Sequence, residues 1–127
     1  MKSRDGVIRL KRFHVEEKRR QVTQIETMIA EFERMAKDLD DQISAEQERT
    51  GIHDAGHFAY PTFAKAASQR RDNLRASVVD LKSQRAAATA ELDEATEELG
   101  KYEAIAQRDH AERAAAEKKT AEAAAAH

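Results

Sequence analysis

The chain has 127 residues, of which 36% are charged and 5% aromatic, and its formal net charge is −2 at pH 7. These proportions argue against a thick globular core and favour long helices with much solvated surface. Cysteine is absent, which excludes disulfides and thiolate chemistry, and no apolar run is long enough to span a membrane. The first residues are charged and do not resemble a signal peptide, so we expect a cytoplasmic protein.

The first 50 residues carry a heptad repeat of apolar residues. Its members follow one another at spacings of three, four or seven: Ile8, Val15, Val22, Ile25, Ile29, Phe32, Ala36, Leu39 and Ile43. This spacing keeps a narrow apolar stripe on one side of a helix, and the stripe is buried only when a second helix covers it. We therefore expect a helix over about residues 4–50, with Ser3 or Asp5 as its N-cap.

The opening turns of this repeat are its weakest part, because Lys11 and Lys18 occupy positions in the seam. Val7, Leu10 and Phe13 lie close to these lysines in the sequence. We expect the three apolar side chains to substitute for the lysines in the contact with the second helix.

The two helices are separated by a predicted joint over residues 51–60. In the segment 57–63, His-Phe-Ala-Tyr-Pro-Thr-Phe, Phe58, Tyr60 and Phe63 are three of the chain's six aromatic residues. One explanation is an aromatic plug that closes the end of the coiled coil, with Phe58 and Phe63 packed together as a hydrophobic staple. The other is an exposed patch that docks a partner, since aromatic residues dominate binding hot spots. Both remain open, because one ring can cap the core while another stays accessible.

The second apolar repeat follows a helix start at about residue 61, where Pro61 suits the first turn of a helix. Its members are Leu74, Val78, Leu81, Ala88, Leu92, Ala95, Leu99, Tyr102 and Ala106. Gly100 is a weak point that costs about 1 kcal/mol relative to Ala. Residues 111–127 are rich in Ala and lack large apolar residues, so they are predicted to form a helical or frayed tail.

Charge indicates how the two helices face each other. Residues 1–20 and 65–85 are basic, whereas residues 26–54 and 91–127 are acidic. If the chain reverses at the joint, residue i lies opposite about residue 112 − i, and each basic block faces an acidic one. A parallel dimer would align like charges instead. The sequence therefore predicts an all-α fold, a long antiparallel coiled-coil hairpin of residues 1–110 that is followed by the tail.

No motif in the chain indicates catalysis, and we expect no enzymatic activity, no metal and no cofactor. His53 and His57 are spaced like zinc ligands, but they flank a glycine in the predicted turn and no cysteine accompanies them. Basic residues cluster at positions 18–20 and at Arg70 and Arg71. Both clusters face acidic blocks in the predicted hairpin, which argues against binding of nucleic acid.

Two groups of residues carry a resemblance to a known family. The first helix contains Arg9-Leu10-Lys11-Arg12-Phe13, Glu17-Lys18-Arg19-Arg20-Gln21-Val22 and Ile25-Glu26; the joint and second helix contain His57-Phe58-Ala59-Tyr60-Pro61, Phe63-Ala64-Lys65-Ala66-Ala67 and Arg70-Arg71-Asp72-Asn73-Leu74. With these residues the chain resembles the FliJ family of the flagellar type III export apparatus, in particular its alphaproteobacterial members. The resemblance covers about residues 1–100.

The resemblance implies an antiparallel hairpin similar to the gamma subunit of rotary ATP synthases. The helical ends of such a hairpin enter the pore of the hexameric export ATPase FliI, and here Arg4, Lys11 and Arg12 are the residues expected to contact it. Another surface contacts the export gate FlhA, and the family also engages export chaperones. The protein would then be cytoplasmic, at the cytoplasmic face of the membrane-embedded export gate.

For the gate, the resemblance implies a contact through Phe58, Tyr60, Phe63 and Ala67. Tyr60 and Phe63 match an aromatic pair in the gate-contacting surface of the family, whereas relatives can carry a bulky apolar residue where this chain has Ala67. The alternative function is a general coiled-coil adaptor or dimerisation protein, for which the joint would serve as a structural cap.

Overall fold

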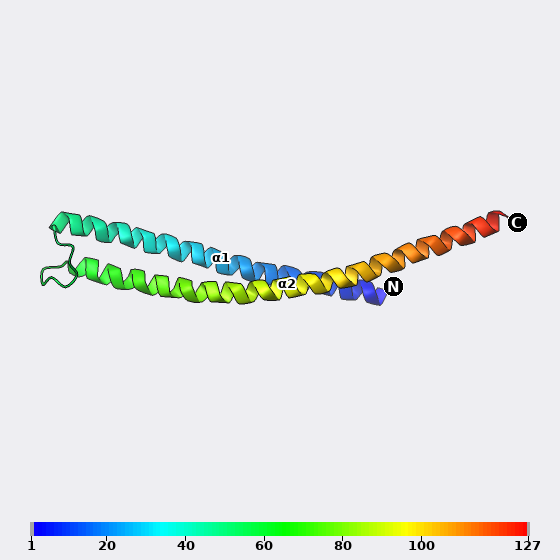
Figure 1. Ribbon diagram of the computed structural model, residues 1–127, viewed down its shortest axis with the longest axis horizontal. Helices are drawn as coiled ribbons and strands as arrows, with labels where there is room; N and C mark the ends of the chain where they lie inside the picture. Colours follow the sequence, from blue (N-terminus) through cyan, green and yellow to red (C-terminus); the bar gives the residue numbers. More distant parts are fainter. Residues whose placement is uncertain (1, 127) are drawn as a thin grey trace. The chain divides into compact units, whose positions relative to one another are not determined.

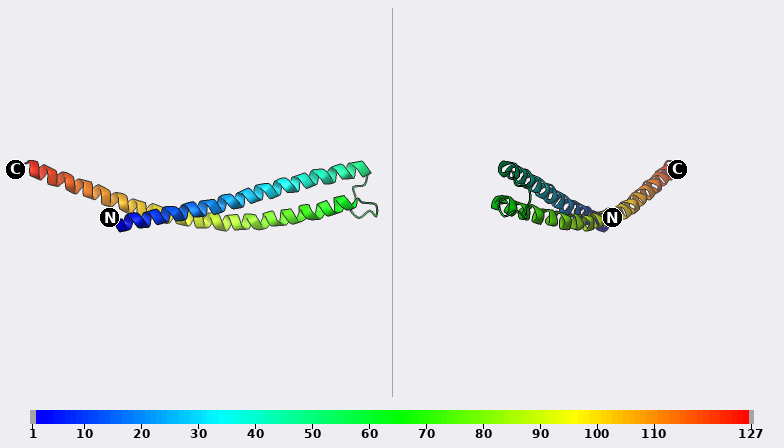
Figure 2. Two further views of the ribbon diagram at one scale, coloured as in Figure 1. Left: turned by 180° about the vertical axis from the view of Figure 1, so that it is seen from behind. Right: turned by 60° about the vertical axis from the view of Figure 1, so that its left-hand side comes forward.

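Two long helices account for most of the computed structural model, which describes residues 2–126 and the side chains of residues 4–126 (Figure 1). Helix α1 spans Lys2–Thr50 and helix α2 spans Thr62–Ala125, and the loop of residues 51–61 joins them. The helices run in opposite directions side by side, as both further views also show (Figure 2). No strand occurs between residues 2 and 126. The predicted all-α two-helix antiparallel hairpin is confirmed.

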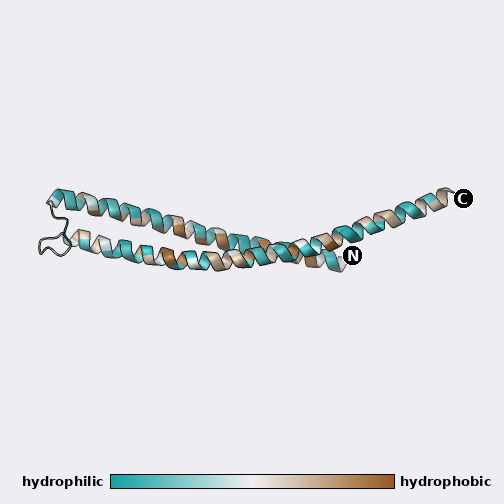
Figure 3. Cartoon of the chain, in the orientation of Figure 1, coloured by the Kyte–Doolittle hydropathy of each residue, from teal (hydrophilic) through white to brown (hydrophobic). Residues whose placement is uncertain are grey.

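Each helix contributes to two compact units. The terminal unit comprises residues 1–20 and 89–127, and the joint unit comprises residues 21–88. In both units a segment of α1 packs against a segment of α2. Hydrophobic residues recur at intervals along both helices, between stretches of hydrophilic residues (Figure 3).

The joint unit contains most of the buried apolar side chains. Its two clusters consist of Leu39, Ile43, Ala64 and Ala67, with Tyr60 and Leu74 packed against them, and of Ile29, Val78 and Leu81, with Ile25 and Phe32 packed against them. Ala64 is completely buried, with an exposed fraction of 0%. Alanine in a seam lets two helix backbones approach closely, so these positions tolerate little extra volume.

The terminal unit is held together differently. Ile8 and Val15 are its buried apolar residues among the side chains that the structure describes. Lys11 lies between these two residues in the sequence, and Lys18 follows Val15. Both lysines occupy the seam as predicted, and each ammonium group forms an ion pair with a carboxylate of α2. Long lysine stems cover apolar surface while their charges stay near water, so the lysines themselves fill the seam.

The prediction that neighbouring apolar residues would replace these lysines is wrong. Val7, Leu10 and Phe13 are 39%, 57% and 59% exposed. A helix advances by about 100° per residue, which turns these three side chains away from the stripe that Ile8 and Val15 define.

Ion pairs between the helices fix the register. In the terminal unit they join Arg4 to Asp109, Lys11 to Glu98, Arg12 to Glu103 and Lys18 to Glu91; in the joint unit they join Glu33 to Lys82 and Asp40 to Arg71 and Arg75. The sequence predicts that residue i of α1 faces residue 112 − i of α2. In every pair the α2 residue lies within one helical turn of that predicted position. The basic and acidic blocks therefore face each other as the sequence predicts.

The helix ends refine the predicted boundaries. Helix α1 begins at Lys2, so Asp5 is not the N-cap but lies within the first turn. A negative charge in the first turn interacts favourably with the helix dipole. At its other end Gly51 adopts a φ of 73° and donates a backbone hydrogen bond of 2.8 Å to Gln47. This left-handed conformation is typical of a helix C-cap and favours glycine.

Helix α2 continues through Gly100 and through the predicted tail as far as Ala125. All described side chains from residue 111 onward are exposed. Across the described residues, neither helix has a stretch apolar enough to cross a membrane.

Candidate functional site

The loop between the helices has a defined backbone conformation. The backbone N–H of His57 donates to the carbonyl of Asp54 at 3.0 Å, and that of Tyr60 donates to the carbonyl of His57 at 3.0 Å. The side chains of the same two loop residues add local bonds, because Asp54 Oδ1 accepts from Gly56 N and His57 Nδ1 accepts from Ala59 N. Two consecutive turns therefore present the aromatic segment at the end of the hairpin.

Tyr60 anchors this loop to the helices. Its half-buried ring packs against the cluster around Leu39 and Ile43, and its hydroxyl accepts a hydrogen bond of 2.9 Å from Gln47 Nε2. The apolar ring thus closes the end of the seam while the hydroxyl finds a polar partner. Tyr60 has the capping role that the first explanation of the joint predicts.

Phe58 and Phe63 lie outside the core. Phe58 is 96% exposed and Phe63 is 54% exposed, and the ring of Phe58 stacks on His57 with 4.7 Å between ring centroids. The predicted hydrophobic staple is therefore wrong, since Phe58 is almost fully open to solvent. Exposure of two large aromatic side chains on one short segment favours a docking surface.

Ala67 requires a correction. The resemblance to the FliJ family places it in a partner contact, but the side chain is only 3% exposed and belongs to the core cluster with Ile43 and Ala64. It lies one turn after Phe63 in sequence but points into the seam, because the apolar stripe of α2 passes through Ala64 and Ala67. The joint surface thus consists of Phe58 and Phe63, with Tyr60 beneath it.

The three residues expected to contact an ATPase pore lie in the terminal unit and take part in ion pairs within the chain. Arg4 pairs with Asp109, Lys11 with Glu98 and Arg12 with Glu103. The Arg12 pair is the loosest, with 3.7 Å between the charged atoms and an arginine side chain that is 62% exposed. Arg12 is therefore the most accessible of the three.

The Lys11 pair has a visible electrostatic effect. The Lys11 ammonium donates a hydrogen bond of 2.9 Å to Glu98, which raises the pKa of Lys11 and lowers that of Glu98. The ammonium also lies 4.8 Å from the centre of the Tyr102 ring. This contact adds a cation–π interaction to the ion pair.

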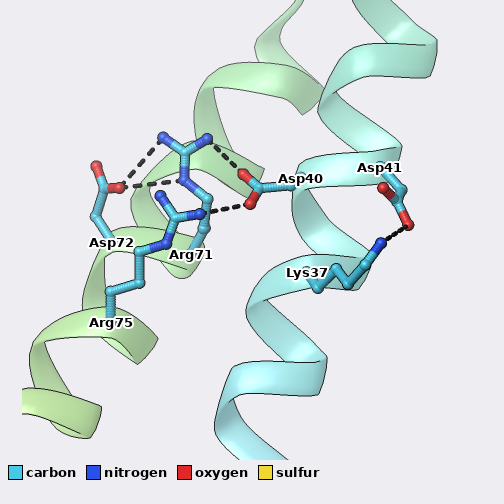
Figure 4. Close-up of polar contacts among 6 residues, drawn as sticks. All are labelled: Lys37, Asp40, Asp41, Arg71, Asp72 and Arg75. Carbon is cyan, nitrogen blue, oxygen red and sulfur yellow. Dashed lines mark hydrogen bonds and ion pairs between the residues drawn. The ribbon is translucent and has the colours of Figure 1, made fainter.

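Asp40 forms the main polar contact between the helices of the joint unit (Figure 4). Its carboxylate accepts hydrogen bonds from Arg71 at 2.8 Å and from Arg75 at 2.5 Å, and Asp72 holds Arg71 from the other side at 3.2 Å. The hydrogen bond from Asp40 raises the pKa of Arg71. A clamp of two arginines on one carboxylate fixes the rotation of α2 against α1 close to the joint.

A hollow of about 280 Å³ in the terminal unit is lined almost entirely by charged and polar side chains: Lys11, His14, Lys18, Glu91, Glu94, Ala95 and Glu98. The sequence does not single out this hollow, because it forms only when the lysine seam of α1 meets the glutamates of α2. Among the described residues no three His, Cys, Asp or Glu side chains are arranged to hold a metal ion. The hollow suits polar contacts with a partner.

No known protein family, curated protein or solved structure matches this chain. The fold and the joint define its class as an antiparallel helical hairpin with an aromatic surface at the closed end.

Proposed function

We propose that this chain is a FliJ-type component of the bacterial flagellar type III export apparatus. In this role it binds the export ATPase FliI, the export gate FlhA and export chaperones during flagellum assembly. It acts in the cytoplasm at the cytoplasmic face of the gate. It catalyses no reaction and binds no nucleic acid; its activity is to hold other components in position.

The proposal rests on the difference in burial among the three aromatic residues of the joint. Tyr60 packs inward and bonds Gln47, whereas Phe58 and Phe63 are exposed. A structural cap explains a buried ring, but it does not explain a phenylalanine that is 96% exposed. A partner that covers these rings would remove apolar surface from water and would gain binding energy from it.

In the mechanism we propose, the chain binds the ATPase ring and the gate through two different surfaces. The ends of the helices contact the ATPase ring. Arg12 is the main contact, because its ion pair is longer than those of Arg4 and Lys11 and its side chain is more exposed than theirs. The joint surface contacts the gate. Interfaces that rely on exposed charge and a small aromatic patch suit transient binding, as a cycle of export requires.

The first experiment deletes the gene in the bacterium that encodes it and scores swimming and flagellin secretion. We expect cells that secrete little flagellin and do not swim, and restoration by the unchanged gene. Normal flagella in the deletion strain would reject the export function. A general coiled-coil adaptor would then be the better explanation.

The second experiment separates the joint surface from the fold. Phe58 and Phe63 are both replaced by Ala, and capture of the purified gate protein is measured together with helicity. A matched control replaces the exposed Val79 of α2 by Ala, since this side chain is 70% exposed but lies away from the joint. We expect loss of capture for the double variant alone, with helicity unchanged. Equal capture by both variants would contradict a gate contact at the joint.

A further inference from the structure

In the joint unit, helix α1 carries an apolar stripe that is wider than the part α2 covers. Beside the buried Ile29 and Ala36, the stripe includes the half-buried Phe32 and the exposed Met28 and Met35. A helix that packs against one other helix needs two apolar positions per heptad, whereas three are typical of a helix covered by two neighbours. Within residues 2–126, α2 is the only helix available to cover this segment.

The two exposed methionines lie on one flank of the hairpin. Met28 and Met35 are seven residues apart and are 43% and 36% exposed. A helix turns by about 100° per residue, so Met35 lies on one side of the buried Ala36 and Glu33 lies on the other. Glu33 pairs with Lys82 of α2. The methionines therefore lie on the flank opposite this ion pair.

The same flank of α2 carries uncharged polar side chains. Ser77 lies one residue before the buried Val78, and Gln84 follows Ser77 by one heptad; both are exposed. Lys82 is four residues after Val78, so it lies on the other side of the buried stripe from Ser77. We name the surface formed by the following residues the methionine flank: Met28, Phe32, Met35, Ser77 and Gln84.

Carboxylates border the methionine flank on both helices. On α1, Glu31 and Asp38 lie beyond the methionines on the side away from α2; on α2, Asp80 lies beyond the two polar side chains. All three carboxylates are on exposed residues. Toward the joint, the first cation on this flank is Arg70, seven residues before Ser77, and it marks the end of the surface.

Most cations at the level of the methionine flank lie on other faces of the helices. Residues 24–38 and 74–88 contain Arg34, Lys37, Arg75, Lys82 and Arg85. Lys37, Arg75 and Lys82 line a groove on the opposite flank. Arg85 is half-buried at a seam position. These four cations are therefore separated from the acidic edges.

The acidic edges keep most of their charge. Arg34 lies on the side of α1 away from α2, 3.9 Å from Asp38, and both side chains are largely exposed, so this pair is weak. Asp80 accepts a hydrogen bond of 2.9 Å from the uncharged Gln84. The ion pairs of the described side chains do not include Glu31. The methionine flank is therefore apolar at its centre and negatively charged at both edges.

We infer that the methionine flank docks an amphipathic helix of another protein whose apolar face is bordered by lysine or arginine. A third helix in this position covers Phe32 and both methionines, as the three apolar positions per heptad of α1 require. Methionine suits such a surface, because its unbranched side chain adapts to the shape of a partner. The carboxylates at both edges select a basic partner. The inference concerns a surface distinct from the joint and holds whether or not the chain acts in flagellar export.

A second copy of the chain fits this surface less well. Two copies that met through their methionine flanks would bring Glu31, Asp38 and Asp80 of both chains to one interface, where like charges repel. The exposed tail from residue 111 to residue 125 carries three acidic and three basic residues, so it offers no net positive charge. Its apolar residues are all alanines, which bury little surface against methionine.

The test measures binding of a synthetic peptide to the full chain by fluorescence anisotropy. The probe is an amphipathic peptide of about 18 residues with a leucine face bordered by lysines, long enough to form a helix. A second peptide has glutamate in place of every lysine. We expect the lysine peptide to bind at least about tenfold more tightly than the glutamate peptide, and we expect its affinity to fall with rising salt.

Two variants locate the binding. The double variant Met28→Gln, Met35→Gln should bind the lysine peptide at least about tenfold more weakly. The matched control Leu10→Gln, Phe13→Gln changes two other exposed apolar residues of α1, 57% and 59% exposed, and should bind as the unchanged chain does. Circular dichroism should give the same helicity for both variants, since glutamine is a good helix former.

A further pair of variants separates the acidic edges from the net charge. Glu31→Gln, Asp80→Asn neutralises one carboxylate on each edge and should weaken binding of the lysine peptide at least about threefold. The control Glu26→Gln, Glu48→Gln removes the same number of negative charges from other faces of α1. We expect the control to keep the affinity of the unchanged chain.

Four results would overturn the inference. The first is the absence of binding by the lysine peptide, or tighter binding of the glutamate peptide. The second is equal binding of the lysine peptide by the unchanged chain and by the Met28→Gln, Met35→Gln variant. The third is equal weakening by the two carboxylate variants, because net charge alone would then attract the peptide. The fourth is a dimer of the unchanged chain in sedimentation that the methionine variant converts to a monomer, because the occupant of the flank would then be a second copy.

Discussion

Gln47 of α1 donates a hydrogen bond to the hydroxyl of Tyr60, and this single bond ties the end of the first helix to the loop that begins the second. The distance is 2.9 Å and the bond is partly buried. It joins two segments whose only covalent link is a loop of short turns, so it contributes to the position of Phe58 and Phe63 as well as to stability.

Replacement of Tyr60 tests this anchor. Tyr60→Phe keeps the ring and removes the hydroxyl, so the free energy of unfolding should fall by about 0.5–1.5 kcal/mol. Tyr60→Ala also removes the ring from the Leu39 and Ile43 cluster and should cost clearly more than Tyr60→Phe. Both values are obtained from urea unfolding followed by circular dichroism. Equal stability of Tyr60→Ala and the unchanged chain would contradict an anchoring role.

Asp40 offers a test of the ion pairs. Asp40→Asn removes the charge that Arg71 and Arg75 share, and we expect a loss of about 1 kcal/mol in the free energy of unfolding. Asp41→Asn is the matched control, because Asp41 pairs with Lys37 within one exposed helix face at 3.5 Å (Figure 4). The control should change stability by no more than about 0.5 kcal/mol. Similar losses in both variants would mean that the clamp between the helices adds nothing beyond a surface pair.

Core volume gives a third prediction. Ala64 is fully buried, so Ala64→Leu should overpack the seam and destabilise the chain by about 1–3 kcal/mol. Ala66 is exposed on the same helix, and Ala66→Leu should change stability by less than about 0.5 kcal/mol. Thermal unfolding of the two variants side by side distinguishes them. A harmless Ala64→Leu would show that the helices separate easily at this level.

The Lys11 and Glu98 pair predicts a pH dependence. The pKa of Glu98 lies below its ordinary value of 4.5 in the folded chain, so the pair stabilises the fold above that pH and loses this effect as pH falls through the lower, folded value. The pKa of Lys11 lies above 10.5, so its contribution is lost only as pH rises through the higher, folded value. Between these limits the pair is intact.

Thermal unfolding of Glu98→Gln measures the acid side of this dependence. At neutral pH the variant should be less stable than the unchanged chain, and the difference should shrink as the pH falls below 4.5 and vanish once it is below the lowered pKa of Glu98 in the folded chain. Glu94→Gln serves as the control, because Glu94 lines the same hollow but is in no described ion pair. A stability difference for Glu98→Gln that does not change with pH would refute the electrostatic explanation.

The tail gives a further prediction. Its described side chains are all exposed, so a chain that stops after His110 should unfold at nearly the same temperature as the longer chain. The helical signal in circular dichroism should fall by about the share of the removed residues. A large loss of stability would show that the tail packs against another part of the chain or against a second copy.

Much of the fold follows from the spacing of apolar residues and from the order of the charge blocks. The heptad positions from Ile8 to Ile43 predict which face of α1 is covered, and the alternation of charge predicts the antiparallel register that the ion pair of Asp40 with Arg71 confirms. These features depend on periodicity and long-range charge, which a sequence displays directly.

The details of the candidate sites were harder to predict. Which joint aromatic faces inward depends on two short turns and on the position of Gln47, and the sequence does not display either. Ala67 illustrates the same limit, since resemblance suggests a contact residue while the geometry of the seam buries it. The prediction that Val7, Leu10 and Phe13 contact the second helix is wrong because lysine is rarely expected to fill a core position.

The lysine seam has a consequence for how the hairpin opens. Apolar layers that separate lose their stabilisation outright, whereas an ammonium group that leaves Glu98 or Glu91 can pair with water or with a carboxylate of an incoming protein at little net cost. The terminal unit can therefore exchange internal partners for external ones while the apolar layers of the joint unit stay closed. Within the terminal unit, α1 and α2 are therefore expected to separate more readily when another protein offers carboxylates to the lysines.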